Sequence, residues 1–434
     1  MFFMNPVVIA VAVLLILCFL RVNVLLSLFA AAIVAGLSAG MGMDATMSTC
    51  ISGSGSDPET ALSYIMLGAL AACISYTGVS DILAVKIARV ISGRSLAFVF
   101  LIGFVSCFSQ NLIPVHIAFI PILIPPLLIV MNRLKIDRRA VACALAFGLR
   151  APYVAIPAGF GLIYHGILAD NLTKNGMFID KMEVWRYTWP LGIMMLLGFL
   201  FVAMVLYRKP REYRTVEGIA VDLDTVNTTM LPKHWIALLA AVATLGVQLT
   251  LGSLPLGALI GLALMFLTRA VKWSDMDKIV NDGVALMGFI AFVMLASNGF
   301  AAVLSAGGGV DALVESSLAM IGGSKLLGSL IMMLVGLLIV MGTGTSFGTV
   351  PVLAVLYVPL CMELGISLAG TTLLLAAAST IGDTGSPVSD TTLAPTAGLN
   401  ADGQHDHLWD TCVPTFIASD IPIFVFAVIA PMFL

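Results

Sequence analysis

Apolar runs of about 16 to 24 residues recur along the whole chain of 434 residues, separated by short polar breaks. A run of this length crosses the hydrocarbon core of a bilayer, which is roughly 30 Å thick. Hydrophobic residues make up 60% of the sequence and charged residues only 10%, so little of the chain is left for a water-soluble domain. We therefore expect an all-α polytopic membrane protein.

The polar breaks divide the chain into apolar segments that are candidate membrane spans. These segments cover residues 7–20, 23–41, 59–80, 95–131, 139–169, 186–207, 235–250, 254–270, 283–303, 325–363, 366–399 and 411–434. The first residues, M-F-F-M-N-P-V-V-I-A, carry no basic region and no small-residue cleavage pattern, so they predict a first span rather than a signal peptide. The seven cysteines contain no C-x-x-C pair, so neither a disulfide framework nor a zinc site is indicated.

The two halves of the chain correspond at a constant offset of 230 residues without a gap. The coinciding residues are helix breakers and charges: Gly78 with Gly308, Asp81 with Asp311, Gly93 with Gly323, Pro121 with Pro351 and Pro157 with Pro387. Together with the matching span lengths, this coincidence indicates an internal duplication. We expect a first transmembrane repeat at 1–207, a cytoplasmic linker at 208–234 and a second repeat at 235–434.

Basic residues predict how the chain is oriented, because cytoplasmic loops of membrane proteins are rich in Lys and Arg. The cytoplasmic candidates are the linker, with Arg208, Lys209, Arg211, Arg214 and Lys233, and an earlier loop with Arg133, Lys135, Arg138 and Arg139. A third cytoplasmic candidate, with Lys86, Arg89 and Arg94, precedes segment 95–131. This segment then starts and ends on the cytoplasmic side, so we expect a re-entrant hairpin with C-F-S-Q-N-L-I-P at its tip. One loop resists this scheme: 400–410 should be cytoplasmic but contains no Lys or Arg.

Each repeat then crosses the membrane five times, and this odd number inverts the second copy. The sequence predicts two inverted-topology repeats, about 10 transmembrane helices plus two re-entrant hairpins and two broken helices. The protein is expected in the cell inner (plasma) membrane as a multi-pass protein, with the N-terminus outside and the C-terminus outside. Inverted repeats with broken helices are typical of secondary transporters.

Four polar interruptions lie at membrane depth. Two are hairpin tips, S-C-F-S-Q-N-L-I-P (106–114) and M-G-T-G-T-S-F-G-T-V-P (341–351). Two are helix breaks, F-G-L-R-A-P-Y-V-A-I-P-A-G-F-G (147–161) and A-S-T-I-G-D-T-G-S-P-V-S-D-T-T (378–392). Irregular backbone persists in a bilayer only where its N–H and C=O groups find partners in protein or in a water-filled cavity. The alternative is that these Gly-Thr-rich segments only kink or pack helices.

The second break carries two aspartates among hydroxyl side chains, and the second tip adds more hydroxyls. Sodium is a hard ion that prefers about five or six oxygen ligands, with one carboxylate at most to balance its charge. We therefore predict a Na⁺ site at Asp383 and Asp390. Its further candidate ligands are Thr343, Thr345, Ser346, Thr380, Ser386 and Thr391.

The stretch G-D-T-G-S-P-V-S-D-T-T-L-A-P resembles the G-D-x-x-S-P-[LV]-S-D-T-T signature of the NhaC-type sodium/proton antiporter family, within the ion transporter superfamily. The matching residues are Asp383, Ser386, Pro387, Ser389, Asp390, Thr391 and Thr392. The resemblance implies that each hairpin tip faces a broken helix near the midplane. It implies one ion or substrate site from Ser109, Gln110 and Asn111 with 148–161, another from Thr343–Ser346 with 380–392, and a homodimer.

Arg150 lies in the first break, at the position that matches Thr380. A cation exchanger has no evident use for a guanidinium at the midplane, whereas a carrier of an amino or organic acid does, because Arg binds a carboxylate through two hydrogen bonds. The alternative is an internal salt bridge from Arg150 to an aspartate, Asp383, Asp390 or Asp420. The candidate substrate-binding residues are Arg150, Gln110, Thr384, Asn298 and Asp420.

Other polar residues admit two interpretations each. Asp420 lies inside the last span. We interpret it as a proton carrier, as a partner of Arg150 or as a polar group bonded to a neighbouring helix. Asn298 reaches a site or bridges helices. His116 and His165 titrate in the useful range but are more often packing residues. The H-D-H of 405–407 looks metal-like, and we prefer to interpret it as a solvated loop.

Two functions remain. The first and preferred one is Na⁺/H⁺ antiport by alternating access, with Na⁺ and protons competing for the aspartates. The second is Na⁺-coupled symport of a small amino acid or organic acid, with Arg150 binding the carboxylate. The chain lacks a nucleophile–base pair and an H-E-x-x-H motif, so we do not expect an enzyme. The expected partners are Na⁺, protons or a small solute in a lipid bilayer, without nucleic acid and without a cofactor other than Na⁺ as coupling ion.

Overall fold

A chain inside a bilayer must satisfy its backbone N–H and C=O groups internally, and helices do so within one segment. The computed structural model describes residues 4–20, 22–55, 58–79, 82, 95–111, 119–158, 160–214, 229–251, 253–309, 312 and 323–434. Across these residues the regular structure is helical throughout, without a strand. This agrees with the predicted all-α membrane protein.

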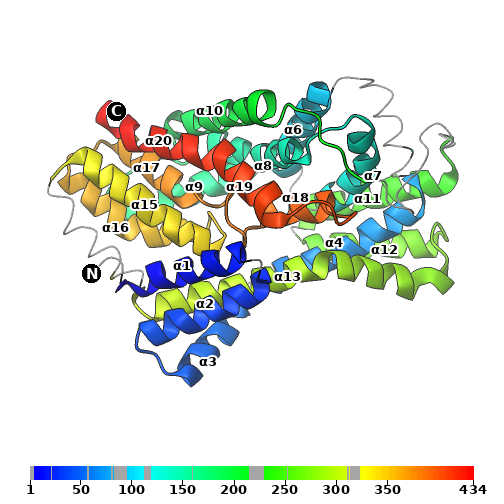
Figure 1. The fold of residues 1–434 in the computed structure, drawn as a ribbon, viewed down its shortest axis with the longest axis horizontal. Helices are drawn as coiled ribbons and strands as arrows, with labels where there is room; N and C mark the ends of the chain where they lie inside the picture. The colour runs from blue at the N-terminus through cyan, green and yellow to red at the C-terminus, as the bar shows by residue number, and fades with distance from the viewer. Residues whose placement is uncertain are drawn as a thin grey trace.

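The first half of the chain contains ten helical elements in the described part. They are α1 (Pro6–Phe19), α2 (Val24–Ser38), α3 (Met43–Ser54), α4 (Pro58–Tyr76), α6 (Ser95–Asn111), α7 (Phe119–Arg133), α8 (Arg138–Ala155), α9 (Phe160–Lys174), α10 (Trp185–Phe201) and its π-helical continuation η2 (Val202–Leu206). Figure 1 shows α1, α2 and α3 together at one side of the molecule and α8 and α10 at the opposite side.

The second half begins with α11 (Pro232–Leu251), α12 (Leu254–Leu267), the short η3 (Trp273–Asp275) and the long α13 (Met276–Ala306). It continues with α15 (Lys325–Thr343), α16 (Thr349–Glu363), α17 (Leu368–Thr380) and α18 (Asp390–Leu399). The last span is assembled from η4 (His407–Cys412), α19 (Val413–Thr415), η5 (Phe416–Asp420), α20 (Ile421–Ile429) and η6 (Ala430–Met432). In Figure 1 the α15–α16 hairpin and the α11–α12 pair occupy opposite ends, with α18 between them.

Four described helices are long and apolar enough to cross a membrane: Trp185–Leu206, Met287–Ala306, Lys325–Thr343 and His407–Met432. The pair formed by α8 and α9 is bent by 50° and would make a fifth span if counted as one. Further apolar helices in the described part are shorter, with 10–17 residues. The protein is therefore a multi-pass helical membrane protein.

The polar helix α3 is absent from the segments that the sequence predicted. Its sequence M-D-A-T-M-S-T-C-I-S-G-S is too hydrophilic to be recognised as a span, but its small residues let it lie very close to α13. A Cβ atom on Gly53 would lie 3.2 Å from the carbonyl oxygen of Asn298, and a Cβ atom on Gly299 only 2.5 Å from that of Cys50. Close backbone packing therefore explains an element that hydropathy missed.

Helix starts recur at the same offset as the sequence features. α6 and α15 begin at residues 95 and 325, α7 and α16 at 119 and 349, α8 and α17 at 138 and 368, and α9 and α18 at 160 and 390. Each pair is separated by 230 positions, so the hairpin and broken-helix elements follow one another in the same order and spacing in both halves.

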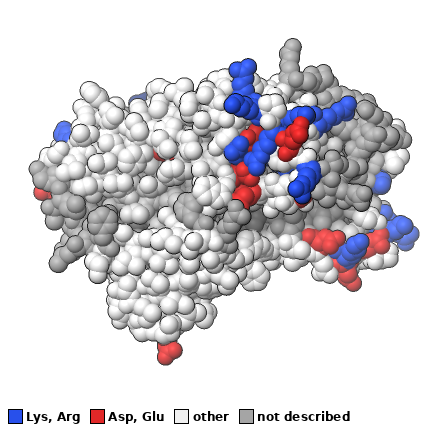
Figure 2. All heavy atoms as spheres, in the orientation of Figure 1, with Lys and Arg blue, Asp and Glu red and all other residues white. Residues whose placement is uncertain are grey.

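Loop 400–410 lies beside the basic loop that precedes α8. The side chain of Arg138 forms hydrogen bonds of 2.6 and 2.5 Å to the two carboxylate oxygens of Asp402, and Arg211 Nη1 lies 2.7 Å from Asp410 Oδ1. Figure 2 shows acidic and basic side chains gathered over one part of the drawn face, while most of the described surface on this face is uncharged. The loop therefore supplies acidic side chains that pair with Arg138 and Arg211.

The interpretation of 405–407 as a solvated loop is wrong for His405. Its side chain is only 2% exposed, and its Nε2 lies 2.7 Å from Thr411 Oγ1. Burial lowers the pKa of His405 to about 3, so the ring is neutral near neutral pH. The described residues contain no group of three or more His, Cys, Asp or Glu side chains arranged to hold a metal ion.

Candidate functional site

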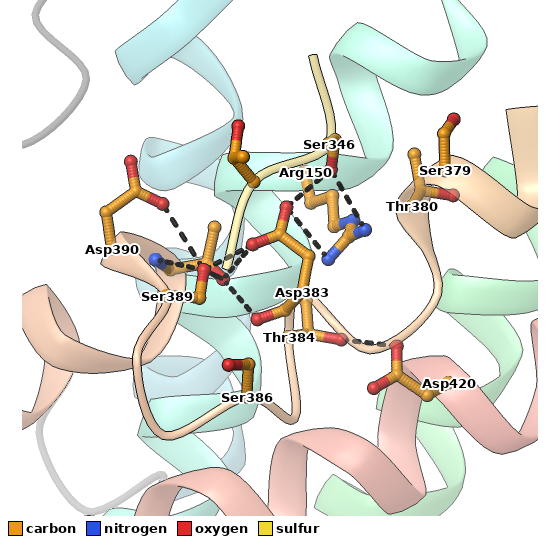
Figure 3. Close-up of polar contacts among 12 residues, drawn as sticks. Arg150, Ser346, Ser379, Thr380, Asp383, Thr384, Ser386, Ser389, Asp390 and Asp420 are labelled. Atoms are coloured by element: carbon orange, nitrogen blue, oxygen red, sulfur yellow. Dashed lines mark hydrogen bonds and ion pairs between the residues drawn. The ribbon is translucent and has the colours of Figure 1, made fainter. Parts of the chain in front are cut away.

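The tip of the α15–α16 hairpin lies against the break between α17 and α18. α15 ends at Thr343 and is followed by its C-cap residue Gly344, which has a φ of 65° and turns the chain. A Cβ atom there would lie 2.9 Å from the carbonyl oxygen of Val388, so only glycine allows this approach. Two residues later, Ser346 Oγ donates a hydrogen bond of 2.6 Å to Asp383 Oδ2 (Figure 3).

Side chains of the break itself complete the environment of Asp383, which is only 4% exposed. Ser389 Oγ donates a hydrogen bond to Asp383 Oδ1, and Thr391 Oγ1 lies 3.3 Å from the same oxygen. Thr391 Oγ1 also donates to the carbonyl oxygen of Asp383 at 3.0 Å. The hydroxyl groups of three residues from the tip and the break therefore converge on one carboxylate.

Local sequence explains why the helix stops here and starts again. Gly382 has a φ of 88°, a conformation that interrupts a helix and favours glycine. Ser389 is the N-cap of α18, and its side chain accepts a hydrogen bond from Thr391 N. Ser386 Oγ donates to the carbonyl oxygen of Met341 at 2.8 Å, which ties the break to the end of α15. The break is thus an ordered segment rather than a loose loop.

We call the place where the tip around Ser346 meets the break around Asp383 the junction. Arg150 reaches the junction from α8 and is fully buried. Its Nη1 lies 3.3 Å from Asp383 Oδ2, and its Nη2 donates a 3.3 Å hydrogen bond to Ser346 Oγ. Its Nε and Nη1 have no hydrogen-bond partner among the described residues. A guanidinium carries five N–H donors, so the group is under-satisfied for a buried side chain. The structure therefore contains the internal salt bridge that the sequence left open, with Asp383 as partner.

Tyr153 also belongs to the junction, although the sequence analysis did not select it. Its hydroxyl donates a hydrogen bond of 3.2 Å to Ser346 Oγ, and its ring lies 5.5 Å from that of Phe347. Tyr164 lies 5.4 Å from both rings and extends the aromatic wall. Helical spacing could have indicated Tyr153, because residues three apart share a helix face and Arg150 precedes it by three positions.

Asp420 lies beside the junction on the last span. It ends the π-helical turn η5, and its side chain is fully buried. Thr384 Oγ1 donates a hydrogen bond of 2.8 Å to Asp420 Oδ1. Single π-helical turns inside a membrane helix often occur at functional sites because they redirect one side chain.

The other predicted ion ligands differ in where they lie. The hydroxyl of Thr380 donates to the carbonyl oxygen of Ala376 in its own helix at 2.7 Å, and therefore does not face Asp383. Asp390 is partly exposed at the start of α18, where Ser389 Oγ lies 3.4 Å from its Oδ1. The side chains of Ser109, Gln110 and Asn111, and the whole of His116, lie outside the described part of the structure.

Two cavities lie beside the tip and the break. The smaller, of about 290 Å³, is lined by Asn298, Thr343, Thr345 and Thr349, so three predicted site residues share one hollow. The larger cavity, of about 550 Å³, has Pro387, His407 and neighbouring residues of α18 and α13 in its wall. His407 Nε2 lies 2.8 Å from the carbonyl oxygen of Pro387. His165 is a packing residue, with its Nε2 2.9 Å from the carbonyl oxygen of Val154.

The solved structures that resemble this chain include two transporters of low sequence identity. The YdaH transporter of Alcanivorax borkumensis and MtrF of Neisseria gonorrhoeae each give a TM-score of 0.45 at 13% identity, covering 89% of this chain. The matches cover 87% and 84% of those chains respectively.

Sequence comparison is more informative. Residues 144–430 match the model of the Na⁺/H⁺ antiporter family, and residues 5–91 match a second model described as the Na⁺-H⁺ antiporter family. Similar proteins include the uncharacterized membrane protein VP2115 of Vibrio parahaemolyticus, 45% identical over 99% of this chain and 100% of that one. The putative amino acid transporter YuiF of Bacillus subtilis is 44% identical over 99% of this chain and 100% of its own. These matches confirm the resemblance noted in the sequence: the chain belongs to the Na⁺/H⁺ antiporter family, a family of membrane transporters.

Proposed function

We propose that this protein is a cation-coupled secondary transporter of a small amino acid, which binds by its carboxylate to Arg150 and by its ammonium group to Asp383. The observation that carries the proposal is the incomplete satisfaction of Arg150. A fully buried guanidinium with Nε and Nη1 lacking a hydrogen-bond partner among the described residues is costly unless a ligand completes it. A carboxylate is the natural complement, because it accepts two parallel N–H bonds.

The charge of the junction favours a zwitterion over a dicarboxylate. The Arg150–Asp383 contact of 3.3 Å is long for an ion pair, and an amino acid inserted between the two groups would replace it by two ion pairs. A second carboxylate would instead meet the carboxylate of Asp383 and would be repelled. The 44% identity to a putative amino acid transporter supports the same solute class.

Sodium is the proposed coupling ion. Several oxygen atoms that could coordinate a hard cation lie together here. They belong to the carboxylate and the backbone carbonyl of Asp383 and to the hydroxyl groups of Ser346, Ser389 and Thr391. Asp390 lies next to Ser389 and adds a second carboxylate at the edge of this shell. The cation would hold the break and the tip together, since its ligands come from both.

Alternating access by two inverted repeats is the proposed mechanism. The recurrence of helix starts at an offset of 230 positions supports a duplicated architecture with repeats at 1–207 and 235–434. The proposed orientation has the linker 208–234 inside and both termini outside, with about ten spans. Arg150 then belongs to one repeat and Asp383 to the other, so the solute would bind at the interface between the moving parts.

Na⁺/H⁺ exchange is the second candidate. The family models favour it, and so do the buried acids Asp383 and Asp420. The two candidates differ in whether Arg150 is needed, because an exchanger of small cations requires no guanidinium at its site.

Uptake into proteoliposomes tests the proposal. Purified protein is reconstituted, and the uptake of individual radiolabelled amino acids is measured with and without an inward Na⁺ gradient. We expect Na⁺-stimulated uptake of at least one amino acid, abolished in Arg150→Gln and retained in Arg186→Gln, a matched change at an exposed arginine. Absence of amino acid uptake by wild type, together with Na⁺-driven proton movement that Arg150→Gln leaves intact, would establish the exchanger instead.

A further inference from the structure

A second buried acid is linked to the Arg150–Asp383 pair through neighbouring residues of the break. Asp420 is fully buried; one carboxyl oxygen accepts the hydrogen bond from Thr384, and the other has no hydrogen-bond partner in the described part of the chain. Figure 3 shows Thr384 turned towards Asp420, whereas the adjacent Asp383 is turned towards Arg150. Two consecutive residues therefore connect two separate sites.

The break packs directly on this carboxyl group. A Cβ atom on Gly385 would lie 2.8 Å from Asp420 Oδ2 and 2.5 Å from a ring carbon of Phe416, so the unpartnered oxygen faces a stretch of bare backbone. On the other side, Thr415 Oγ1 donates to the carbonyl oxygen of Thr384. Any movement of the break therefore changes the surroundings of Asp420.

The charges that face Asp420 are few. Arg150 of α8 and Asp383 of the break are close enough to interact with it electrostatically, and no described ion pair includes it. Among the helices packed on η5, neither α19 nor α20 carries a titratable residue. The titratable residues of α10, Arg186 and Tyr187, lie roughly 16 Å or more along the helix from Gly198, the residue that contacts η5.

These surroundings favour the neutral acid. Besides the hydroxyl of Thr384, the backbone N–H of Gly382 is the hydrogen-bond donor near this carboxyl group. An ionised carboxylate without an ion pair of its own is costly in a buried site, whereas a protonated carboxyl group is not. The hydroxyl of Thr384 serves either form, since it donates to the oxygen that remains unprotonated. Displacement of Thr384 and Gly385 would admit water and lower the cost of ionisation.

We propose that Asp420 is the proton-binding group of this transporter, separate from the Arg150–Asp383 pair and coupled to it through Thr384. A proton from water on one side of the membrane forms the O–H bond of the Asp420 carboxyl group. After the segment between α17 and α18 has moved, this O–H bond is broken and the proton passes to water on the other side of the membrane. No further reactant is required. The inference extends the proposed function by making the proton a transported ion.

Infrared difference spectroscopy of the purified full-length protein tests the proton directly and without a substrate. At neutral pH we expect a C=O band of a protonated carboxylic acid that shifts in heavy water, disappears in Asp420→Asn and changes frequency in Thr384→Val. Asp180→Asn, at an exposed aspartate, should leave the band unchanged. A band that persists unaltered in Asp420→Asn, or the absence of such a band in wild type, overturns the proposal.

Proteoliposomes then test whether this proton is transported. With a pH gradient and no Na⁺ gradient, we expect wild type and Asp420→Glu to accumulate the amino acid and Asp420→Asn to lose its response to the gradient. An undiminished response of Asp420→Asn contradicts the assignment. If wild type transports no amino acid under any gradient, the proposed function fails, and the infrared result still decides whether Asp420 holds a proton.

Discussion

Helix α8 carries two fully buried arginines, Arg138 in its first turn and Arg150 near its end, and the two differ in how completely they are bonded. Arg138 forms four hydrogen bonds of 2.5–2.9 Å, two of them to Asp402 and the others to Leu399 O and Asn132 Oδ1. Arg150 forms one hydrogen bond of 3.3 Å and one ion pair of 3.3 Å. Only Nε of Arg138 lacks a hydrogen-bond partner among the described residues, whereas both Nε and Nη1 of Arg150 do. The more extensively bonded arginine supports the fold, and the less bonded one is available to a ligand.

The partners of both arginines come from one stretch of the second half. Asp383 lies in the break before α18, and Asp402 follows the end of α18. The start of α8 is therefore held firmly to the end of α18, and the end of α8 is held more loosely to the break that precedes α18. Movement of the break could alter the Arg150 end while the Arg138 end holds the two elements together.

Replacement of Arg138 should cause the largest loss of stability. Arg138→Met leaves Asp402 buried without its counter-ion, so the free energy of unfolding should fall by about 3–5 kcal/mol. Chemical unfolding in detergent, monitored by intrinsic fluorescence, measures this loss. The double variant Arg138→Met/Asp402→Leu is the control and should recover most of it. A loss below about 1 kcal/mol would show that the pair does not support the fold.

The loop that pairs with Arg138 also contains His405, and this histidine should make the free energy of unfolding depend on pH. The pKa of the buried His405 is about 3 in the folded protein, below the ordinary 6.5, so the unfolded chain binds the proton first. Stability is therefore full above pH 6.5 and falls on acidification, by up to about 1.4 kcal/mol per pH unit from this residue. Unfolding curves between pH 7 and 4.5 should show a weaker fall in His405→Gln than in wild type. Identical slopes contradict this account.

Replacement of Arg150 should affect stability much less than function. Arg150→Met removes a long ion pair, and Asp383 keeps its hydrogen bonds from Ser346, Ser389 and Thr391. We expect the free energy of unfolding to change by about 1 kcal/mol, while Na⁺-dependent uptake is lost. If Arg150→Met unfolds the protein as Arg138→Met does, the distinction between the two arginines disappears.

The smallest effect is expected at Tyr153. Tyr153→Phe removes the hydroxyl that donates to Ser346, a hydrogen bond worth about 1 kcal/mol. Since Ser346 contacts both Arg150 and Asp383, the affinity for the amino acid should fall by about fivefold with little change in stability. Concentration-dependent uptake measures this affinity. An unchanged half-saturation concentration would exclude Tyr153 from the site.

Much of the fold follows from the sequence by simple physical rules. Apolar length predicted the helical membrane protein, and helix breakers such as Gly344 and Pro387 marked the tip and the break. The polar helix α3 was missed because its stability comes from close contact with α13, which hydropathy does not register. The contacts of loop 400–410 were not predicted for a similar reason, because its acidic side chains pair with basic residues that lie far away in the sequence.

The candidate site was only partly predictable. Asp383, Ser346 and Thr391 were selected from the sequence as ion ligands because their polarity is anomalous at membrane depth, and in the structure their side chains lie in contact. The meeting of Arg150 with Asp383 could be stated only as one of three alternatives, since pairing between the halves depends on tertiary packing. The direction of a hydroxyl was also beyond sequence reasoning: Thr380 bonds to its own helix, and Ser389 bonds to Asp383.

Equilibrium binding of amino acids tests the central claim most directly, namely that Arg150 is an incomplete site for a carboxylate. Isothermal titration calorimetry with purified protein in Na⁺-containing buffer compares amino acids, their amides, which lack the carboxylate, and dicarboxylates. The account predicts that an amino acid binds wild type and Arg186→Gln, and that binding disappears with the amide or in Arg150→Gln. Equal binding of the amino acid by wild type and Arg150→Gln would contradict it.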